Sequence, residues 1–276
     1  MQNFDSPGAI ITWFPGKNRI GFAELRNALS TAGLDPNLAK DMAPRNAFSR
    51  AAREMQENRV IDRIDDDAAD AAGEIRFQFT GKQLSDGIQY YKECDLYLNK
   101  ETGYVRCDIE ELRSEATRLI AEHMVQRTPA DVTRLVQRVF ESQGGDLIPI
   151  RQQGGCYFVP VTHLALVNSV NIMLNEIGGN LNQWKIAPSV ETDASISQNL
   201  CDYMGGLIEE FNESLKTIGE SSTPAVVELR IERMGELYLK LNSYGNLLGS
   251  FSSEITKALS DSQQQLVRAN DRRVAA

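Results

Sequence analysis

The strongest restriction on the fold comes from a heptad pattern near the end of the chain. Apolar residues follow one another there at alternating steps of three and four, which places them on one face of an α-helix. A Thr223-Pro224 helix start precedes this arm, and a shorter apolar stripe over residues 200–218 precedes that start. The pattern predicts a C-terminal α-helical hairpin or coiled coil over residues 191–276, with a frayed tail from Ala269 to Ala276. The heptad positions are Met234, Leu237, Leu241, Tyr244, Leu248, Phe251, Ile255 and Ala258.

The second arm of this hairpin is longer than the first. If the first arm begins near Ser195, antiparallel pairing covers the second arm only to about residue 248. Fully burying a Leu or Phe side chain is worth about 1.5–3 kcal/mol, so the overshoot needs a cover. We expect self-association through Leu248, Phe251, Ile255 and Leu259; the alternative is that these residues dock on their own protein.

A second legible stretch lies in the middle of the chain. Residues 144–160 form two short β-branched and aromatic runs joined by a Gly-Gly turn, which predicts a β-hairpin. An amphipathic helix precedes the hairpin, with Thr128 as its N-cap and Pro129 at its first position. Another helix follows over residues 162–177. With strands at 104–108 and 183–187, this order predicts a ferredoxin-like α/β sandwich over residues 83–190, or alternatively a second winged helix.

Residues 88–108 read as another β-hairpin. If positions whose numbers sum to 201 stand opposite one another, compatible side chains pair on both faces of the hairpin. Cys94 then faces Cys107, either as two small buried side chains or as a redox pair. The other predicted pairs are Leu96 with Val105, Tyr97 with Tyr104, and Asp95 with Arg106.

The N-terminal part, residues 1–82, has the element order of a winged-helix-like domain. A strand at residues 10–14 is followed by three helices, the third of which covers residues 45–57, and then by two strands. In such a domain the third helix reads DNA, and its predicted outer face carries Arg45, Asn46, Arg50 and Arg53. The alternative is that these side chains are simply solvated. The predicted wing favours that alternative, because five carboxylates in residues 62–70 repel phosphate.

The remaining sequence features mainly argue against particular functions. A formal net charge of −9 argues against a general nucleic-acid coat. No apolar run reaches the roughly 18 residues of a membrane span, and the N-terminus lacks a secretory signal, so we expect a cytoplasmic protein. His123, His163 and the four cysteines lack metal-ligand spacing, so we expect no metal. The sequence shows no catalytic or phosphate-binding motif, so we expect no cofactor and no enzymatic activity.

One resemblance adds a hint about the source. The string Gly154-Gly155-Cys156-Tyr157-Phe158-Val159-Pro160, followed by a helix and a Gly-Gly stop, resembles a Gly-Gly-x-Tyr-Phe-Val-Pro element of uncharacterised bacterial and phage proteins. The resemblance covers about residues 128–218, and Cys156 departs from the more ordinary hydrophobe expected there. It implies a prokaryotic or phage source and no activity.

Together these features predict a mainly helical α+β protein of three modules. The leading hypothesis is a non-enzymatic modular interaction protein that contacts duplex DNA through the third N-terminal helix and assembles through its C-terminal helices. The rival hypothesis is a structural or scaffolding protein whose modules bind other proteins and no nucleic acid.

Overall fold

A computed structural model describes residues 6–56, 59–64, 67–84, 88–150, 155–219 and 222–275. The chain forms two compact units. Unit 1 comprises residues 1–14, 140–168 and 181–276, and unit 2 comprises residues 15–139 and 169–180. The predicted α+β class with mostly helix is confirmed. Within the described residues, no helix is both long and apolar enough to cross a bilayer.

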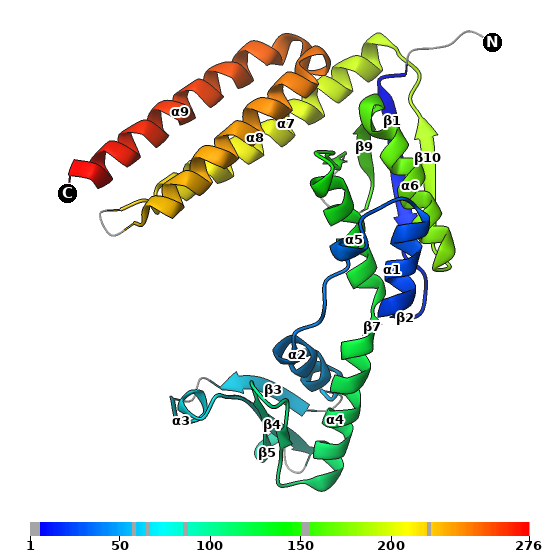
Figure 1. Ribbon diagram of the computed structural model, residues 1–276, viewed down its shortest axis with the longest axis vertical. Helices are drawn as coiled ribbons and strands as arrows, with labels where there is room; N and C mark the ends of the chain where they lie inside the picture. The colour runs from blue at the N-terminus through cyan, green and yellow to red at the C-terminus, as the bar shows by residue number, and fades with distance from the viewer. Residues whose placement is uncertain are drawn as a thin grey trace. The chain divides into compact units, whose positions relative to one another are not determined.

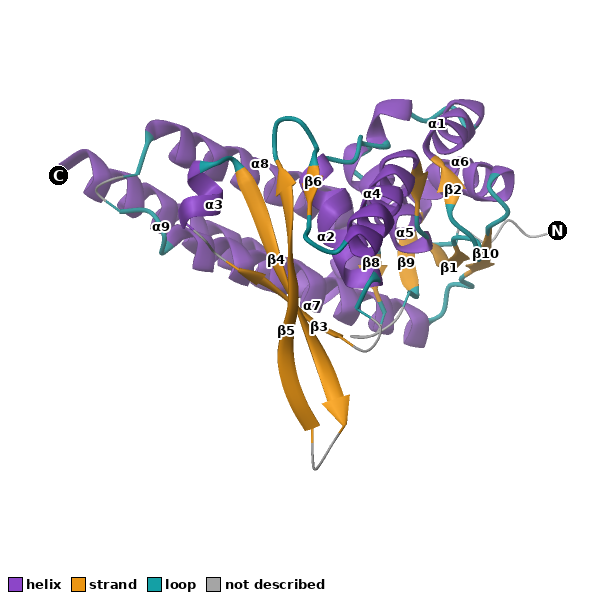
Figure 2. Cartoon of the chain, turned by 90° about the horizontal axis from the view of Figure 1, so that it is seen from below, coloured by secondary structure: helices purple, strands orange, loops and turns teal. Residues whose placement is uncertain are grey.

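Unit 2 contains a four-stranded antiparallel sheet in the order β3-β4-β5-β6. In Figure 2, β4 and β5 form a long two-stranded ribbon. Helices α2 and α4 bury side chains in the same core as the sheet, because α2 places Phe48 and α4 places Leu119 against strand residues such as Phe79. These elements are α2 (Pro44–Glu54), β3 (Arg59–Ile64), α3 (Asp67–Ala71), β4 (Glu74–Leu84), β5 (Ile88–Asn99), β6 (Val105–Arg106) and α4 (Glu110–Val125).

The rest of unit 2 consists mainly of helices and one short strand pair. Helix α1 buries Leu25 and Leu29 and leaves the polar side chain of Glu24 exposed. The elements are β2 (Ile20–Gly21), which pairs with β7 (Gln126–Arg127), α1 (Phe22–Thr31), the 3-10 turn η1 (Pro36–Leu38), and parts of α5 (Pro129–Ser142) and α6 (Leu164–Glu176). Both α5 and α6 contribute residues to the two units.

The predicted register of the β5–β6 hairpin is wrong by two positions. Tyr97 stands opposite Arg106 and Leu98 opposite Val105, so paired numbers sum to 203. The turn explains the shift. The Asn99 side-chain oxygen accepts hydrogen bonds from the backbone N–H groups of residues 101 and 102, and Gly103 has φ 69°, which favours glycine. The loop is therefore longer than the predicted one, and the two cysteines do not stand directly opposite each other.

Unit 1 contains a second sheet, in the order β10-β1-β9-β8. The predicted central hairpin is confirmed, because β8 pairs antiparallel with β9 and places Ile148 opposite Phe158. Its Gly154 lies outside the described residues. The strands are β1 (Gly8–Phe14), β8 (Ile148–Pro149), β9 (Tyr157–Pro160) and β10 (Asn180–Lys185), and the 3-10 turn η2 spans Val161–His163.

Strand β1 departs from the predicted strand pairing. It lies between β10 and β9, a place that the predicted sandwich gave to residues 104–108. Residues 105–106 pair with β5 in unit 2, as the predicted 88–108 hairpin requires, and are not part of this sheet. The predicted boundary between residues 82 and 83 falls within β4 and therefore inside the β4–β5 hairpin. Long-range strand pairing of this kind leaves no local trace in the sequence.

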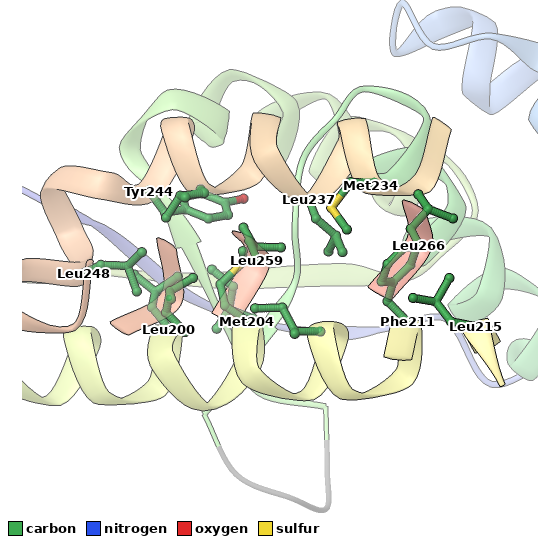
Figure 3. Close-up of a cluster of buried hydrophobic side chains, with 14 of the residues drawn as sticks. Leu200, Met204, Phe211, Leu215, Met234, Leu237, Tyr244, Leu248, Leu259 and Leu266 are labelled. Carbon is green, nitrogen blue, oxygen red and sulfur yellow. The ribbon is translucent and has the colours of Figure 1, made fainter. Parts of the chain in front are cut away.

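The C-terminal part is a bundle of three helices: α7 (Val190–Leu215), α8 (Pro224–Leu248) and α9 (Ser252–Ala275). In Figure 1 the three helices run beside one another. Figure 3 shows Leu200, Met204 and Phe211 of α7 between the backbones of α7 and α8, together with Leu237 and Tyr244 of α8. The heptad seam of α8 is confirmed as buried core. Its predicted continuation as one helix is wrong, and so is the frayed tail, because α9 is helical to Ala275.

The helical hairpin ends where Gly249 turns the chain. This residue has φ 53°, and the 3-10 turn η3 (Gly249–Phe251) leads from α8 into α9. The exposed fractions of Leu248, Ile255 and Leu259 are 0%, 3% and 0%, all within the core of their own bundle. The chain itself therefore supplies the cover that the overshoot argument sought in a second chain.

Candidate functional site

Helix α2 carries the residues that the sequence predicts to contact DNA. It buries Ala47, Phe48, Ala51 and Ala52, spaced so that one face joins the core of unit 2. Arg45, Asn46 and Arg53 are exposed, and Arg50 is half-buried. The predicted outer face of this helix is therefore polar and cationic.

Arg50 is already engaged by a carboxylate. Its Nη1 and Nη2 donate to the two oxygens of Asp131, each over 2.6 Å. Asp131 also completes a capping box with Thr128, whose backbone N–H donates to it over 2.9 Å, so the predicted start of α5 is confirmed. Burial acts to raise the pKa of the Asp131 carboxyl, but these hydrogen bonds outweigh it and hold the pKa below its usual range. Arg50 consequently positions α2 against α5 and is not free to read a base.

Asn46 and Arg50 line a cavity of about 180 Å³ in unit 2. Five cationic side chains and two carboxylates surround it, a local excess of three positive charges in a chain of net charge −9. We call this cavity the arginine pocket. The cations are Lys40, Arg50, Arg127, Arg134 and Arg138, and the carboxylates are Asp41 and Asp131.

Arg127 is the buried member of the arginine pocket, with an exposed fraction of only 5%. Its guanidinium donates to the backbone oxygens of Gln126 over 2.9 Å and of Lys40 over 3.2 Å, and it lies 4.3 Å from the centre of the Phe22 ring. Burial lowers the pKa of this guanidinium, although arginine stays protonated near neutral pH. The hydrogen bonds of this guanidinium go to backbone oxygens of residues 123, 124, 126 and 40, so neutral groups hold its charge in place.

Two further arginines come from one face of α5. Arg134 and Arg138 are four residues apart and so project from neighbouring turns. Arg138 donates to the backbone oxygen of Leu38 over 2.5 Å, whereas the side chain of Arg134 is 67% exposed. Guanidinium groups bind phosphate and carboxylate oxygens in a two-pronged geometry. The pocket can therefore hold an oxyanion without any catalytic group.

The sequence identified only part of this site. Of the four predicted residues, Asn46 and Arg50 line the arginine pocket, and Arg45 and Arg53 lie elsewhere on α2. Arg127 was missed, because a single arginine before a helix cap carries no periodic signal. Among the described residues of the predicted wing, Asp62, Asp67 and Asp70 are exposed. Any polyanion must therefore avoid that loop.

Unit 1 holds a separate polar cluster around Asp146, whose exposed fraction is 6%. Tyr244 donates to its Oδ2 over 2.6 Å, and Tyr203 donates to its Oδ1 over 3.0 Å. Lys240 forms an ion pair with the same Oδ1. Burial and the nearby carboxylate raise the pKa of both phenols, so they remain donors at neutral pH. The cluster ties α7 and α8 to the residues that lead into β8.

The remaining candidate residues are structural. Cys94 and Cys107 are buried free thiols. Burial, and to a smaller extent the hydrogen bond with Cys107, raises the pKa of Cys94 to about 12. A thiol with so high a pKa is a poor nucleophile. His123 is buried with its Nε2 3.3 Å from an oxygen of Glu54. Within the described part of the chain, no three His, Cys, Asp or Glu side chains come together as metal ligands.

These features define a two-unit α+β protein with a cationic pocket in one unit and a helical bundle in the other. The chain belongs to a family of unknown function (DUF6744), whose model matches residues 8–275. No curated protein and no solved structure matches the chain.

Proposed function

We propose that this chain is a non-enzymatic binding protein whose unit 2 holds phosphate groups of duplex DNA at the arginine pocket. One observation carries the proposal: five cations surround a cavity with a buried arginine, in an otherwise acidic chain. Phosphate contacts of Lys and Arg supply most of the affinity of a protein for DNA. The resemblance of the 154–160 element supports a bacterial or phage source, and the proposal includes a cytoplasmic setting.

Helix α2 serves as the DNA-facing helix in this proposal. Asp41 and Asn46 place the arginine pocket at its N-terminal end, where the helix dipole favours negative charge. The following strands β3 and β4 stand in the order of a winged helix, but β1 belongs to the other unit, so the likeness rests on α2 and this hairpin alone. Because the loop after β3 is acidic, the duplex approaches from the N-terminal end of α2.

The test measures binding to a labelled duplex by fluorescence anisotropy, starting at about 50 mM salt and rising. We expect the affinity to fall steeply with salt. Arg134→Ala together with Arg138→Ala should weaken binding and reduce the salt slope by about one per lost phosphate contact. Arg118→Ala is the matched control, since Arg118 is an exposed arginine of the same unit that pairs with Glu115 and does not line the pocket.

Two outcomes contradict the proposal. If the wild type binds no duplex at about 50 mM salt, the pocket does not serve DNA, and the scaffolding hypothesis replaces it. If Arg118→Ala weakens binding as much as the pocket variant does, the loss of affinity reflects the net charge of the protein and not a site at the arginine pocket.

A further inference from the structure

The outward face of α8 carries two leucines that the bundle does not cover. Leu229 is 56% exposed and Leu239 is 68% exposed, although both belong to a well-formed helix. They are ten residues apart, which is about 15 Å along a helix axis. Residues 232, 236 and 243 continue the same stripe at helical spacing.

Two cavities follow this stripe. One, of about 400 Å³, lies between α7 and α8 and is lined by Leu207, Leu229 and Arg233 among others. The next, of about 350 Å³, is lined by α8 and by residues 141–146, including Leu239. The two cavities share Arg233 and Glu236, so they adjoin along α8 and together make a groove with two compartments. We call it the α8 groove.

The groove lies outside the core that the three helices share. Helix α9 shares the buried core with both α7 and α8. The groove is lined by α7, α8 and residues 141–146, and α9 contributes none of the described lining residues. A helix laid into a hydrophobic groove is a common mode of peptide recognition, and its anchors repeat every three or four residues.

Charge decides what kind of helix fits. Arg233 pairs with Glu236 over 2.6 Å, and Lys240 pairs with Asp146. Three further carboxylates line the groove, against one further cation, so the groove carries an excess of two negative charges. These are Glu141, Glu210 and Glu232, with Arg230.

We infer that the α8 groove docks an amphipathic helix of a partner protein, with leucine-like anchors over about three turns and Lys or Arg residues beside them. A second copy of this chain would bring the same acidic groove and meet like charge, which disfavours it. The inference concerns unit 1 and is independent of the arginine pocket in unit 2.

The test uses the full chain and a fluorescent model peptide of leucine and lysine with helical periodicity. We expect saturable binding that weakens as salt rises. Leu229→Ser together with Leu239→Ser should weaken it at least tenfold, because both anchors of the groove are lost. Ile231→Ser is the matched control: Ile231 lies on the same helix, is 57% exposed and does not line the groove.

A second variant tests the charge argument. Glu210→Lys together with Glu232→Lys should weaken binding of the leucine–lysine peptide. The wild-type protein should not bind a matching leucine–glutamate peptide. Tryptophan fluorescence melts show whether each variant stays folded. If Ile231→Ser weakens binding as much as the groove variant, or if the wild type is a dimer that the leucine variant dissociates, the proposed occupant is wrong.

Discussion

Replacing Asp146 with alanine removes the acceptor of three side-chain donors at once. The two hydroxyl groups and the ammonium group then lose the carboxylate that accepts their hydrogen bonds. The donors are Tyr203, Tyr244 and Lys240. A hydrogen bond to a charged group contributes about 1.5–3 kcal/mol, and removing one partner of a buried ion pair costs about 3–5 kcal/mol. The two figures count part of the same interaction, so they are not added. The Lys240 side chain is 20% exposed, so water solvates its ammonium group and reduces the loss of stability. We expect Asp146→Ala to cost about 3–5 kcal/mol.

The position of the tryptophans makes this loss measurable in unit 1 alone. The chain has two, Trp13 and Trp184, and both belong to unit 1. Urea unfolding followed by tryptophan fluorescence therefore reports the unit that contains Asp146, and the midpoint shift times the slope gives the free-energy change. A loss of about 3–5 kcal/mol is a large part of the about 5–15 kcal/mol that keeps a domain folded.

Two companion variants separate the cluster from general effects. Asp202→Ala removes an exposed carboxylate on α7, next to Tyr203, that accepts from Gln198 over 2.8 Å, and should stay within about 0.5 kcal/mol of wild type. Tyr203→Phe should cost about 1–2 kcal/mol, since Lys240 still pairs with Asp146. If Asp146→Ala changes stability by less than about 1 kcal/mol, the cluster is screened by solvent and does not hold the helices to β8.

Three further predictions concern other buried groups. Burial lowers the pKa of His123, so the unfolded chain binds its proton more tightly, and stability should fall as the pH drops through about 6.5; His123→Gln should flatten this part of the urea-midpoint profile relative to wild type. Ile255→Asp places a charge in the bundle core and should cost unit 1 about 3–5 kcal/mol by tryptophan fluorescence; a folded species of smaller mass would instead restore the case for self-association. Cys94 should resist alkylation in the native protein and react after unfolding, as mass spectrometry of labelled peptides would show; rapid native labelling would contradict its burial.

The sequence correctly predicted the elements that depend on interactions between residues close together in the chain. The cap at Thr128, the seam from Met234 to Leu248 and the β8–β9 hairpin each follow from neighbouring residues, and each is present. The break at Gly249 was missed because the apolar spacing of three and four continues across it. Two helices that turn back at a glycine and one long helix have the same heptad pattern, and only the φ of Gly249 distinguishes them.

The arginine pocket could not be assembled from the sequence for a different reason. Its cations come from a loop at residue 40, from α2, from the end of β7 and from α5, which are separated by up to about a hundred positions. No spacing rule connects such segments. Their proximity depends on the pairing of β2 with β7 and on the contact of Arg50 with Asp131.

Asp131 links the fold of the arginine pocket to its charge. It accepts from Arg50 and caps α5, so it compensates one arginine while it fixes the helix that presents Arg134 and Arg138. Asp131→Asn would raise the positive charge of the pocket by one and weaken the cap, and the two effects act on anion binding in opposite directions. Because the pKa of Asp131 lies below its usual range, the unfolded chain takes up the proton first as the pH falls. The stability that this contact contributes should therefore decline only below about pH 4. Anion binding at neutral pH therefore relies on a fully ionised Asp131 to keep its arginines in place.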